Sequence, residues 1–269
     1  DLPSRPDMSR LIEAAREMRW FNTQFVGLDA LPVDTLQQRR VAVTNGAGLN
    51  ATTIAEYIVM AMLAVAKGYR EVVRAQERRD WLTAAPGRVE LAGTRALVIG
   101  YGAIGQGVEA RLKGFDVDVT VVRRSPGGHG DVLGPDQWQT RLGEFDWVIL
   151  AVPATRETLR MIGRAELEAM KPTAVLLNFA RGTLVDQDAL VDALKGGRIG
   201  AAFLDVTDPE PLPRQHTLWT LPNAHISMHL SGRSQTRITE RAALRFLDNL
   251  GRYAAGRPLA NTVDLDLGY

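Results

Sequence analysis

Short apolar runs alternate with helical patterns along most of this chain. Six runs have the length of buried strands, at 96–99, 117–122, 147–152, 174–179, 201–206 and 225–228. Helical patterns lie between most of them, at 103–112, 164–170 and 187–194. Parallel strands need crossover connections, which are usually helices, so the pattern predicts an α/β fold with a doubly wound parallel sheet.

Two more helices are predicted outside this alternation. Between residues 53 and 67, apolar residues recur at helical spacing, after a Thr53-x-x-Glu56 sequence typical of a capping box and before Gly68. The other faces of this helix are apolar too, so we expect burial on more than one side, in the core or in a subunit interface. Residues 234–253 form a long amphipathic pattern, expected to lead the chain back to a first, separate lobe.

Composition limits the possible partners. The 269 residues are 45% hydrophobic, enough for one large or two moderate cores. The net charge is +1, and the charged residues do not form blocks, so neither nucleic acid nor a membrane surface is expected as a partner. The expected partner is a small molecule. The chain has no cysteine, which excludes disulfides and thiolate chemistry and suits the cytoplasm, where we expect the protein. The longest apolar run, 58–66, is too short to span a bilayer, and no secretory leader is visible.

A glycine-rich turn follows the first predicted strand. Gly100-x-Gly102-x-x-Gly105 opens a helix that begins with Ala103 and Ile104. Gly100 allows a tight turn, Gly102 lets the backbone approach a pyrophosphate, and Gly105 lets the helix pack closely on the strand. The free N–H groups at the helix start then face the phosphates. This order of elements predicts a Rossmann dinucleotide-binding unit.

The end of the second strand indicates which dinucleotide is bound. An NAD site usually has Asp or Glu about 20 residues after the glycines. Here the position is taken by Arg123, followed by Arg124 and Ser125. Because a guanidinium suits a phosphate dianion, the sequence predicts NADP(H) in preference to NAD(H). The alternative is that both arginines are simply solvated.

Polar residues that could carry chemistry follow the last three strands. Arg181 follows the fourth strand, Asp205 and Glu210 the fifth, and His229 and Ser231 the sixth. Ligands of such sheets bind at the carboxyl ends of the strands. Hydride transfer to a carbonyl needs a proton donor, a cation beside the oxygen and a group that keeps the donor charged; His229, Arg181 and Glu210 suit these roles. The alternatives are a helix-capping arginine and turn residues in a proline-rich loop.

Other strand ends are expected to meet the nicotinamide half of the cofactor. These candidate residues are Val152, Pro153, Thr158 and Ala180. No metal site is predicted: His225 lies four residues before His229, a spacing that makes a metal pair only on a helix, and on a strand the two would be about 13 Å apart. We therefore expect His225 to pack or to lie on the surface.

Together these motifs resemble a known family. Asn-Phe-Ala-Arg-Gly-Thr-Leu-Val-Asp (178–186), Leu-Asp-Val-Thr-Asp-Pro-Glu-Pro-Leu (204–212) and His-Leu-Ser-Gly (229–232), with the glycine turn, are similar to signatures of the D-isomer-specific 2-hydroxyacid dehydrogenases. The resemblance runs from about residue 20 to 258. It implies that Arg181, Glu210 and His229 are catalytic, that Asp205 and Ser231 lie at the cofactor, and that the reaction is reduction of a small 2-oxo acid, such as glyoxylate or hydroxypyruvate, to the D-2-hydroxy acid.

The resemblance also implies a second, smaller, flavodoxin-like substrate lobe. It would comprise residues 1–54 and 232–269, with the dinucleotide-binding domain at 55–231. Val26 and Gly27 would grip the substrate carboxylate together with Arg181. Phe25 departs from the family, where a small residue is usual at this position. The first lobe of the family also begins some tens of residues earlier. This lobe is therefore expected to be incomplete at its N-terminus, either in the protein or only in the sequence at hand. The helix at 53–67 would lie in a homodimer interface.

Two other functions remain open from the sequence. One is a relative that oxidises formate or phosphite on the same scaffold. The other is a nucleotide-sensing scaffold or corepressor without catalysis, because a fold does not by itself define a function.

Overall fold

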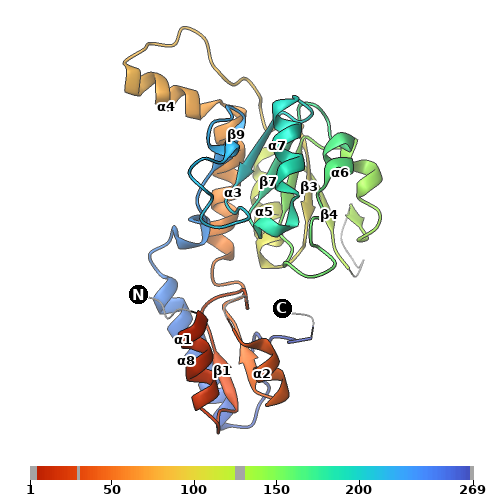
Figure 1. Cartoon of the computed structure of the whole chain (residues 1–269). Coiled ribbons are helices and arrows are strands. Elements are labelled where there is room, and N and C mark those ends of the chain that lie inside the picture. Colours follow the sequence, from red (N-terminus) through yellow and green to blue (C-terminus); the bar gives the residue numbers. More distant parts are fainter. Residues whose placement is uncertain (1–4, 29–30, 125–130, 267–269) are drawn as a thin grey trace. The chain divides into compact units, whose positions relative to one another are not determined.

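The computed structural model describes residues 5–28, 31–124 and 131–266, so Ser125 lies outside the described residues. The chain divides into two compact units, Asp1–Asn50 with Gln235–Tyr269, and Ala51–Ser234 (Figure 1). The domain bounds expected from the sequence lie within a few residues of these limits.

The larger unit contains a seven-stranded, all-parallel sheet in the order β5-β4-β3-β6-β7-β8-β9. The chain runs outward from β3 in both directions, which is the doubly wound arrangement, so the predicted Rossmann-type α/β fold is confirmed. The strands are β3 (Arg95–Ile99), β4 (Asp118–Val122), β5 (Val132–Leu133), β6 (Trp147–Leu150), β7 (Val175–Asn178), β8 (Ala201–Leu204) and β9 (Ala224–Ile226).

All six strands predicted from the apolar runs are present. The edge strand β5 was missed, because two residues are too few to show any periodicity. The last strand also begins one residue earlier than expected and ends at Ile226, so His229 lies beyond it, in a turn.

Helices cover both faces of this sheet. They are α3 (Ala51–Ala66), α5 (Ala103–Leu112), α6 (Arg164–Ala169) and α7 (Gln187–Lys195). The unit also contains α4 (Tyr69–Arg78), which extends away from the sheet in Figure 1. Its 3₁₀ turns are η1 (Lys113–Phe115), η2 (Gln139–Glu144), η3 (Gly182–Leu184), η4 (Thr217–Trp219) and η5 (Ser231–Arg233). Apolar residues of α3 and α5 belong to one core, and those of α6 and α7 to the other.

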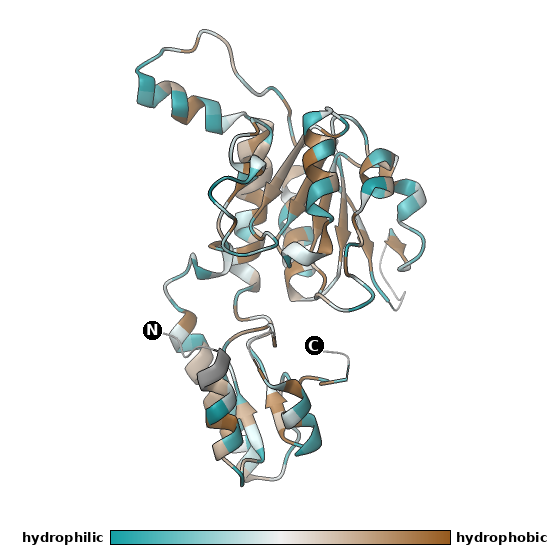
Figure 2. Cartoon of the chain, viewed as in Figure 1, coloured by the Kyte–Doolittle hydropathy of each residue, from teal (hydrophilic) through white to brown (hydrophobic). Residues whose placement is uncertain are grey.

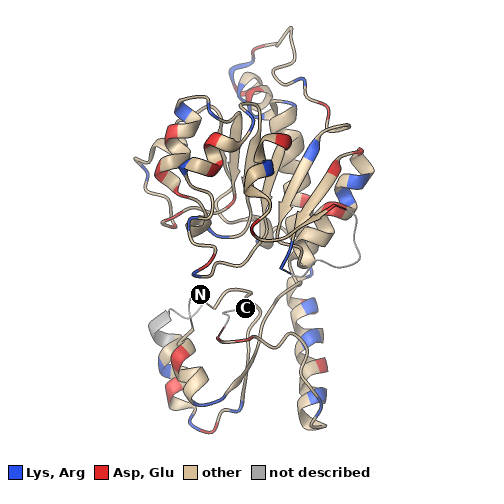
Figure 3. Ribbon diagram, turned by 90° about the vertical axis from the view of Figure 1, so that its right-hand side faces the viewer, with Lys and Arg blue, Asp and Glu red and all other residues tan. Residues whose placement is uncertain are grey.

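The central strand β3 shows why its sequence is a continuous apolar run. Leu97 and Ile99 point into one core, while Ala96 and Val98 point into the other. Successive side chains of a strand face opposite sides of the sheet, and here both sides are covered. Figure 2 shows the strands as hydrophobic and the outer faces of the covering helices as hydrophilic. In Figure 3, positively and negatively charged residues alternate along these helices without a large block of one sign.

Helix α3 begins two residues earlier than the sequence suggested, and the predicted capping box is wrong. Thr53 is buried inside the first turn, and its hydroxyl donates to the carbonyl oxygens of Ser231 and Ser234, at 3.3 and 2.8 Å. Glu56 pairs with Arg111 of α5 instead, at 3.2 Å. Gly68 ends the helix as expected, with a left-handed φ of 60°. Among the described residues no single helix is long and apolar enough to cross a membrane; α3 and α4 meet that condition only as a pair bent by 68°.

The smaller unit contains α1 (Arg5–Ala14), β1 (Trp20–Asn22), α2 (Val33–Gln38), β2 (Ala42–Thr44) and α8 (Ile238–Ala254). Strands β1 and β2 pair in parallel. The ring of Trp20 stacks on Phe246 and Tyr253 of α8, each at 5.5 Å. Helix α8 thus returns to this unit, while its Leu244 and Leu247 side chains stay about 60% exposed.

Candidate active site

The glycine turn between β3 and α5 has the geometry of a dinucleotide cradle. Gly100 has φ +104°, and a Cβ built there would lie 2.4 Å from the Ala151 carbonyl oxygen. A Cβ on Gly105 would lie 2.2 Å from the Gly100 oxygen, whereas one on Gly102 would meet nothing within 4 Å. The turn is therefore open at Gly102, the N-cap of α5, where a pyrophosphate can approach the backbone. These residues fit the cofactor that the sequence predicts.

Arg123 lies directly beside this turn. Strands β3 and β4 pair Ile99 with Val122, and the Gly100 N–H donates to the Val122 oxygen at 3.1 Å. The Arg123 guanidinium carbon lies over the Tyr101 ring, 5.9 Å from its centroid. Arg124 makes an exposed ion pair with Glu157 at 3.0 Å. Of the two described residues predicted to recognise the ribose phosphate, Arg123 and Arg124, Arg123 thus lies against Tyr101 of the glycine turn.

His229 and Glu210 form the central polar contact of the candidate site. The imidazole Nδ1 lies 2.8 Å from a Glu210 carboxylate oxygen, and both side chains are about 40% exposed. Met228 and His229 have φ values of +54° and +56°, a backbone region that costs energy for residues other than glycine. The His229 N–H donates to the Asp205 carbonyl at 2.6 Å. The turn therefore holds the imidazole in a defined place beside the carboxylate.

Asp205 organises that turn from below. Its carboxylate is buried, with 2% of the residue exposed. One oxygen accepts from the Ser227 hydroxyl at 2.7 Å and from the N–H groups of Leu230 and Ser231 at 3.1 and 3.2 Å, and the other accepts from the Ser231 hydroxyl. Asp205 and Ser231, both predicted at the cofactor, are thus hydrogen-bonded to each other in the turn that carries His229.

Arg181 lies on a loop held by a buried amide. Asn178 ends β7 with 1% exposure; its Nδ2 donates to the Arg181 carbonyl at 2.8 Å, and its Oδ1 accepts from the Ala180 N–H at 3.1 Å. A Cβ on Gly182 would lie 2.1 Å from the Thr207 carbonyl. The Thr207 N–H in turn donates to Glu210 at 3.2 Å. The loop that carries Arg181 and the loop that carries Glu210 are therefore in direct backbone contact.

Three supporting residues were not predicted from the sequence. Asn178 and Ser227 are described above. The third is Gln187 at the start of α7, whose side chain accepts from the Asp208 N–H at 3.1 Å and donates to the Asp208 carbonyl at 2.8 Å. The peptide bonds before Pro209 and Pro211 in this loop are cis. Asn178 could have been found as a polar residue that ends an apolar strand; Gln187 and Ser227 gave no such signal.

The residues predicted at the nicotinamide half all follow β6 or β7. The Val152 side chain lies against Gly100. The Thr158 hydroxyl donates to the Pro153 carbonyl at 2.8 Å and accepts from the Thr155 N–H at 2.8 Å, so it shapes its own loop. Ala180 is held by Asn178. Their contact with a cofactor stays a prediction.

Val26 and Gly27, the predicted substrate-binding residues, belong to the smaller unit. The Asn45 side chain donates to the Val26 carbonyl at 3.0 Å, and the Gly46 N–H donates to the Phe25 carbonyl at 2.9 Å. The residues after β2 thus fix the loop, and the Phe25 and Val26 side chains are 48% and 44% exposed.

His225 lies apart from His229, on β9. Its ring is parallel to that of Phe203, with 5.8 Å between the centroids. Burial, and then the charges of Arg70 and Arg74, lower the pKa of His225 to about 4. Within the part of the chain that the structure describes, no group of three His, Asp or Glu side chains is arranged to hold a metal ion.

This chain is similar to known proteins in both sequence and structure. Residues 59–231 match the family model for the D-isomer specific 2-hydroxyacid dehydrogenase, NAD binding domain. A glyoxylate reductase from Thermococcus litoralis is 32% identical over 267 residues, which cover 96% of this chain and 80% of that protein. A D-3-phosphoglycerate dehydrogenase from Archaeoglobus fulgidus is 30% identical over 262 residues, 96% of this chain but 49% of that longer protein.

The fold of this chain is also similar to that of solved structures. A D-isomer specific 2-hydroxyacid dehydrogenase from Xanthobacter autotrophicus, crystallised in complex with NADPH and MES, superposes with a TM-score of 0.81 at 29% identity, covering 93% of this chain and 79% of that one. The chain therefore belongs to the D-isomer specific 2-hydroxyacid dehydrogenase family. It is an oxidoreductase that acts on a CH–OH group and contains an NAD(P)-binding domain, so the resemblance seen in the sequence is confirmed.

Proposed function

We propose that this enzyme uses NADPH to reduce a small 2-oxo acid, of the glyoxylate or hydroxypyruvate type, to the D-2-hydroxy acid. The observation that carries the proposal is the 2.8 Å contact between His229 and Glu210, because the Glu210 loop also packs against the loop that carries Arg181. All three loops leave the carboxyl edge of the sheet that also carries the glycine turn. The glyoxylate reductase among the relatives supports the substrate class.

Each side chain has a role that follows from its chemistry. The Arg181 guanidinium binds the substrate carboxylate and draws electron density from the neighbouring carbonyl. His229 donates a proton from Nε2 to the carbonyl oxygen, and Glu210, hydrogen-bonded to Nδ1, fixes the orientation of the ring. The bound cofactor supplies the hydride that the carbonyl carbon accepts. The 2-oxo acid, the hydride and the proton together give the D-2-hydroxy acid, and the cofactor is left oxidised. Val26 and Gly27 would hold the substrate carboxylate by their N–H groups.

The preference for NADPH over NADH rests on the end of β4. Arg123 lies beside the glycine turn, with Arg124 and Ser125 after it in the sequence. NAD-specific sites usually have Asp or Glu at this position, and such a carboxylate would repel the 2′-phosphate of NADPH. The structure of the Xanthobacter relative in complex with NADPH supports this choice.

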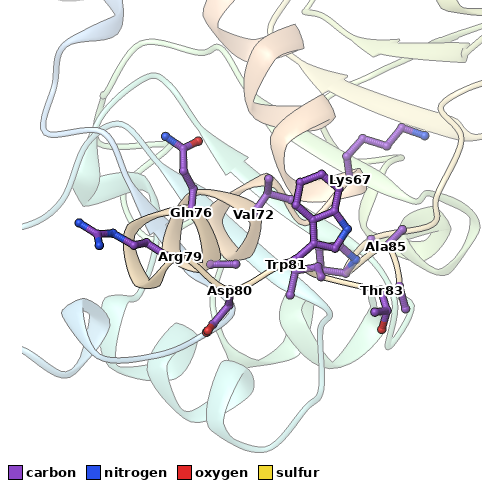
Figure 4. A pocket seen from close by; sticks show the side chains of 13 residues that line it. Lys67, Val72, Gln76, Arg79, Asp80, Trp81, Thr83 and Ala85 are labelled. Carbon is purple, nitrogen blue, oxygen red and sulfur yellow. The ribbon is translucent and has the colours of Figure 1, made fainter.

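The same proposal includes a homodimer formed through α3. Met60 of this apolar helix is 45% exposed, and just beyond α4 the side chain of Trp81 is 94% exposed. Trp81 lines a pocket of about 750 Å³ between α4 and the segment that returns from it (Figure 4). An exposed apolar surface of this kind marks an interaction site, and a second copy of the chain would cover it. We place the enzyme in the cytoplasm, which suits a chain without cysteine.

The test is oxidation of NADPH, and of NADH in parallel, over a panel of 2-oxo acids, with formate and phosphite oxidation by NADP⁺ as separate arms. Turnover of glyoxylate or hydroxypyruvate is expected, with a higher kcat/KM for NADPH. In His229→Gln, turnover should fall by about 10²-fold or more while NADPH still binds. Turnover of formate or phosphite alone would assign the alternative oxidation, and a folded dimer that binds NADPH without any turnover would indicate a nucleotide-sensing scaffold.

A further inference from the structure

Tyr101 occupies the variable position between the first two glycines of the turn, and it is fixed at both ends. Its ring lies under the Arg123 guanidinium, 5.9 Å from centroid to Cζ. Its hydroxyl donates to the carboxylate of Glu109 on α5. The Glu109 side chain is only 14% exposed and is paired with Lys113 at 2.9 Å. The three side chains therefore connect α5 to the end of β4 across the glycine turn.

The charges along this connection are consistent with a fixed tyrosine. Hydrogen bonding to Glu109 and partial burial raise the pKa of Tyr101, and the nearby Arg123 opposes that shift. The ring therefore stays neutral at physiological pH, and a neutral aromatic face attracts a guanidinium. An arginine whose guanidinium is already held loses less conformational freedom when it binds a phosphate.

Arg124 lies in a different environment. Its guanidinium pairs with Glu157, and both side chains are more than half exposed. Glu157 follows β6 while Arg124 follows β4, on opposite sides of β3. A phosphate at this edge would have to compete with a carboxylate for Arg124, whereas Arg123 is held by a neutral ring.

We propose that Tyr101, anchored by Glu109, is a positioning residue for recognition of the 2′-phosphate: it holds the Arg123 guanidinium beside the glycine turn, where the phosphate of NADPH binds. This inference rests on the proposed NADPH preference. It makes the residue between Gly100 and Gly102 a determinant of cofactor specificity through an arginine on the next strand.

The experiment measures the Kd of the enzyme for NADPH and for NADH by fluorescence titration. In Tyr101→Leu, which removes the ring, we expect Kd for NADPH to rise about 3- to 5-fold, the size expected of an exposed cation–π contact, with Kd for NADH nearly unchanged. Tyr101→Phe keeps the ring and should keep most of the preference. Glu109→Ala frees the hydroxyl and should lower the preference to a value between those two. Tyr69→Leu, at a tyrosine 58% exposed on α4, is the matched control.

The outcomes separate the inference from the function on which it rests. A wild-type enzyme that binds NADPH and NADH equally would contradict the proposed cofactor preference. If the wild type prefers NADPH and Arg123→Ala abolishes that preference, but Tyr101→Leu keeps it, Tyr101 has no positioning role. In the Arg123→Ala background, Tyr101→Leu should change the NADPH/NADH ratio no further, and an additional loss would overturn the inference. Thermal unfolding confirms that each variant folds; if Tyr101→Leu does not, Glu109→Ala decides, and an unchanged ratio in that variant also overturns the inference.

Discussion

At the scale of single residues, Asp205 shows how much of the site is held by a buried carboxylate. Asp205→Ala would leave the donors of Ser227, Leu230 and Ser231 without their acceptor. Unsatisfied buried donors cost about 1–3 kcal/mol each before relaxation, so we expect unfolding free energy to fall by roughly 3 kcal/mol, with kcat falling as the His229 turn loosens. Urea unfolding and steady-state kinetics measure both. An unchanged stability with a raised KM for cofactor alone would instead place Asp205 at the nicotinamide.

His225 gives the protein a pH dependence of known sign. Its pKa is lowered from 6.5 to about 4 in the folded chain, so between these values the unfolded chain binds more protons. The contribution of His225 to the free energy of unfolding is therefore fully present above pH about 6.5. It is lost as the pH falls toward 4, by an amount on the order of 2 kcal/mol. His225→Phe keeps the stacked ring and removes the titration. Urea unfolding at both ends of this range should show a smaller pH effect in the variant; an equal effect would assign it to other groups.

At the scale of elements, the contact between two loops depends on one glycine. A methyl group on Gly182 would lie 2.1 Å from the Thr207 carbonyl, a backbone atom that cannot turn away. Gly182→Ala should separate the Arg181 and Glu210 loops, lowering kcat/KM at least about 10-fold, since small misplacements in an active site are costly. Gly114→Ala, where a Cβ meets nothing within 4 Å, is the matched control and should retain activity. Equal kinetics in the two variants would show that the loop contact has no role.

Elements with a continuous apolar pattern were predictable, and those without one were not. β3 and β6 are buried on both faces, so their sequences identify them. β5 has two residues and depends on pairing with β4. The sequence around Thr53 is typical of a helix N-cap, yet its hydroxyl donates to the carbonyl oxygens of Ser231 and Ser234. Those residues are distant in sequence but lie beside it in the fold. Local patterns lose to tertiary contacts where the competing partner is remote in sequence.

At the scale of the whole molecule, the proposed homodimer is testable through α3. Met60→Glu places a charge on the exposed apolar side of this helix and should convert a dimer to a monomer in analytical ultracentrifugation, because burying an unpaired charge is unfavourable. Phe115→Glu, at an exposed apolar residue outside the proposed interface, should leave the dimer intact. If Met60→Glu stays dimeric, α3 is not the interface.

The sequence by itself determined the class of fold, the glycine turn, and the identity of the three side chains expected to act on the substrate. It could do so because buried parallel strands and tight backbone turns impose local requirements on residue type. Only the tertiary structure decided that Asp205 bonds Ser231 beneath His229, that Gln187 holds the proline-rich loop, and that Tyr101 lies under Arg123. Those contacts join residues far apart along the chain, and their partners are set by strand order and loop packing, which no local pattern records.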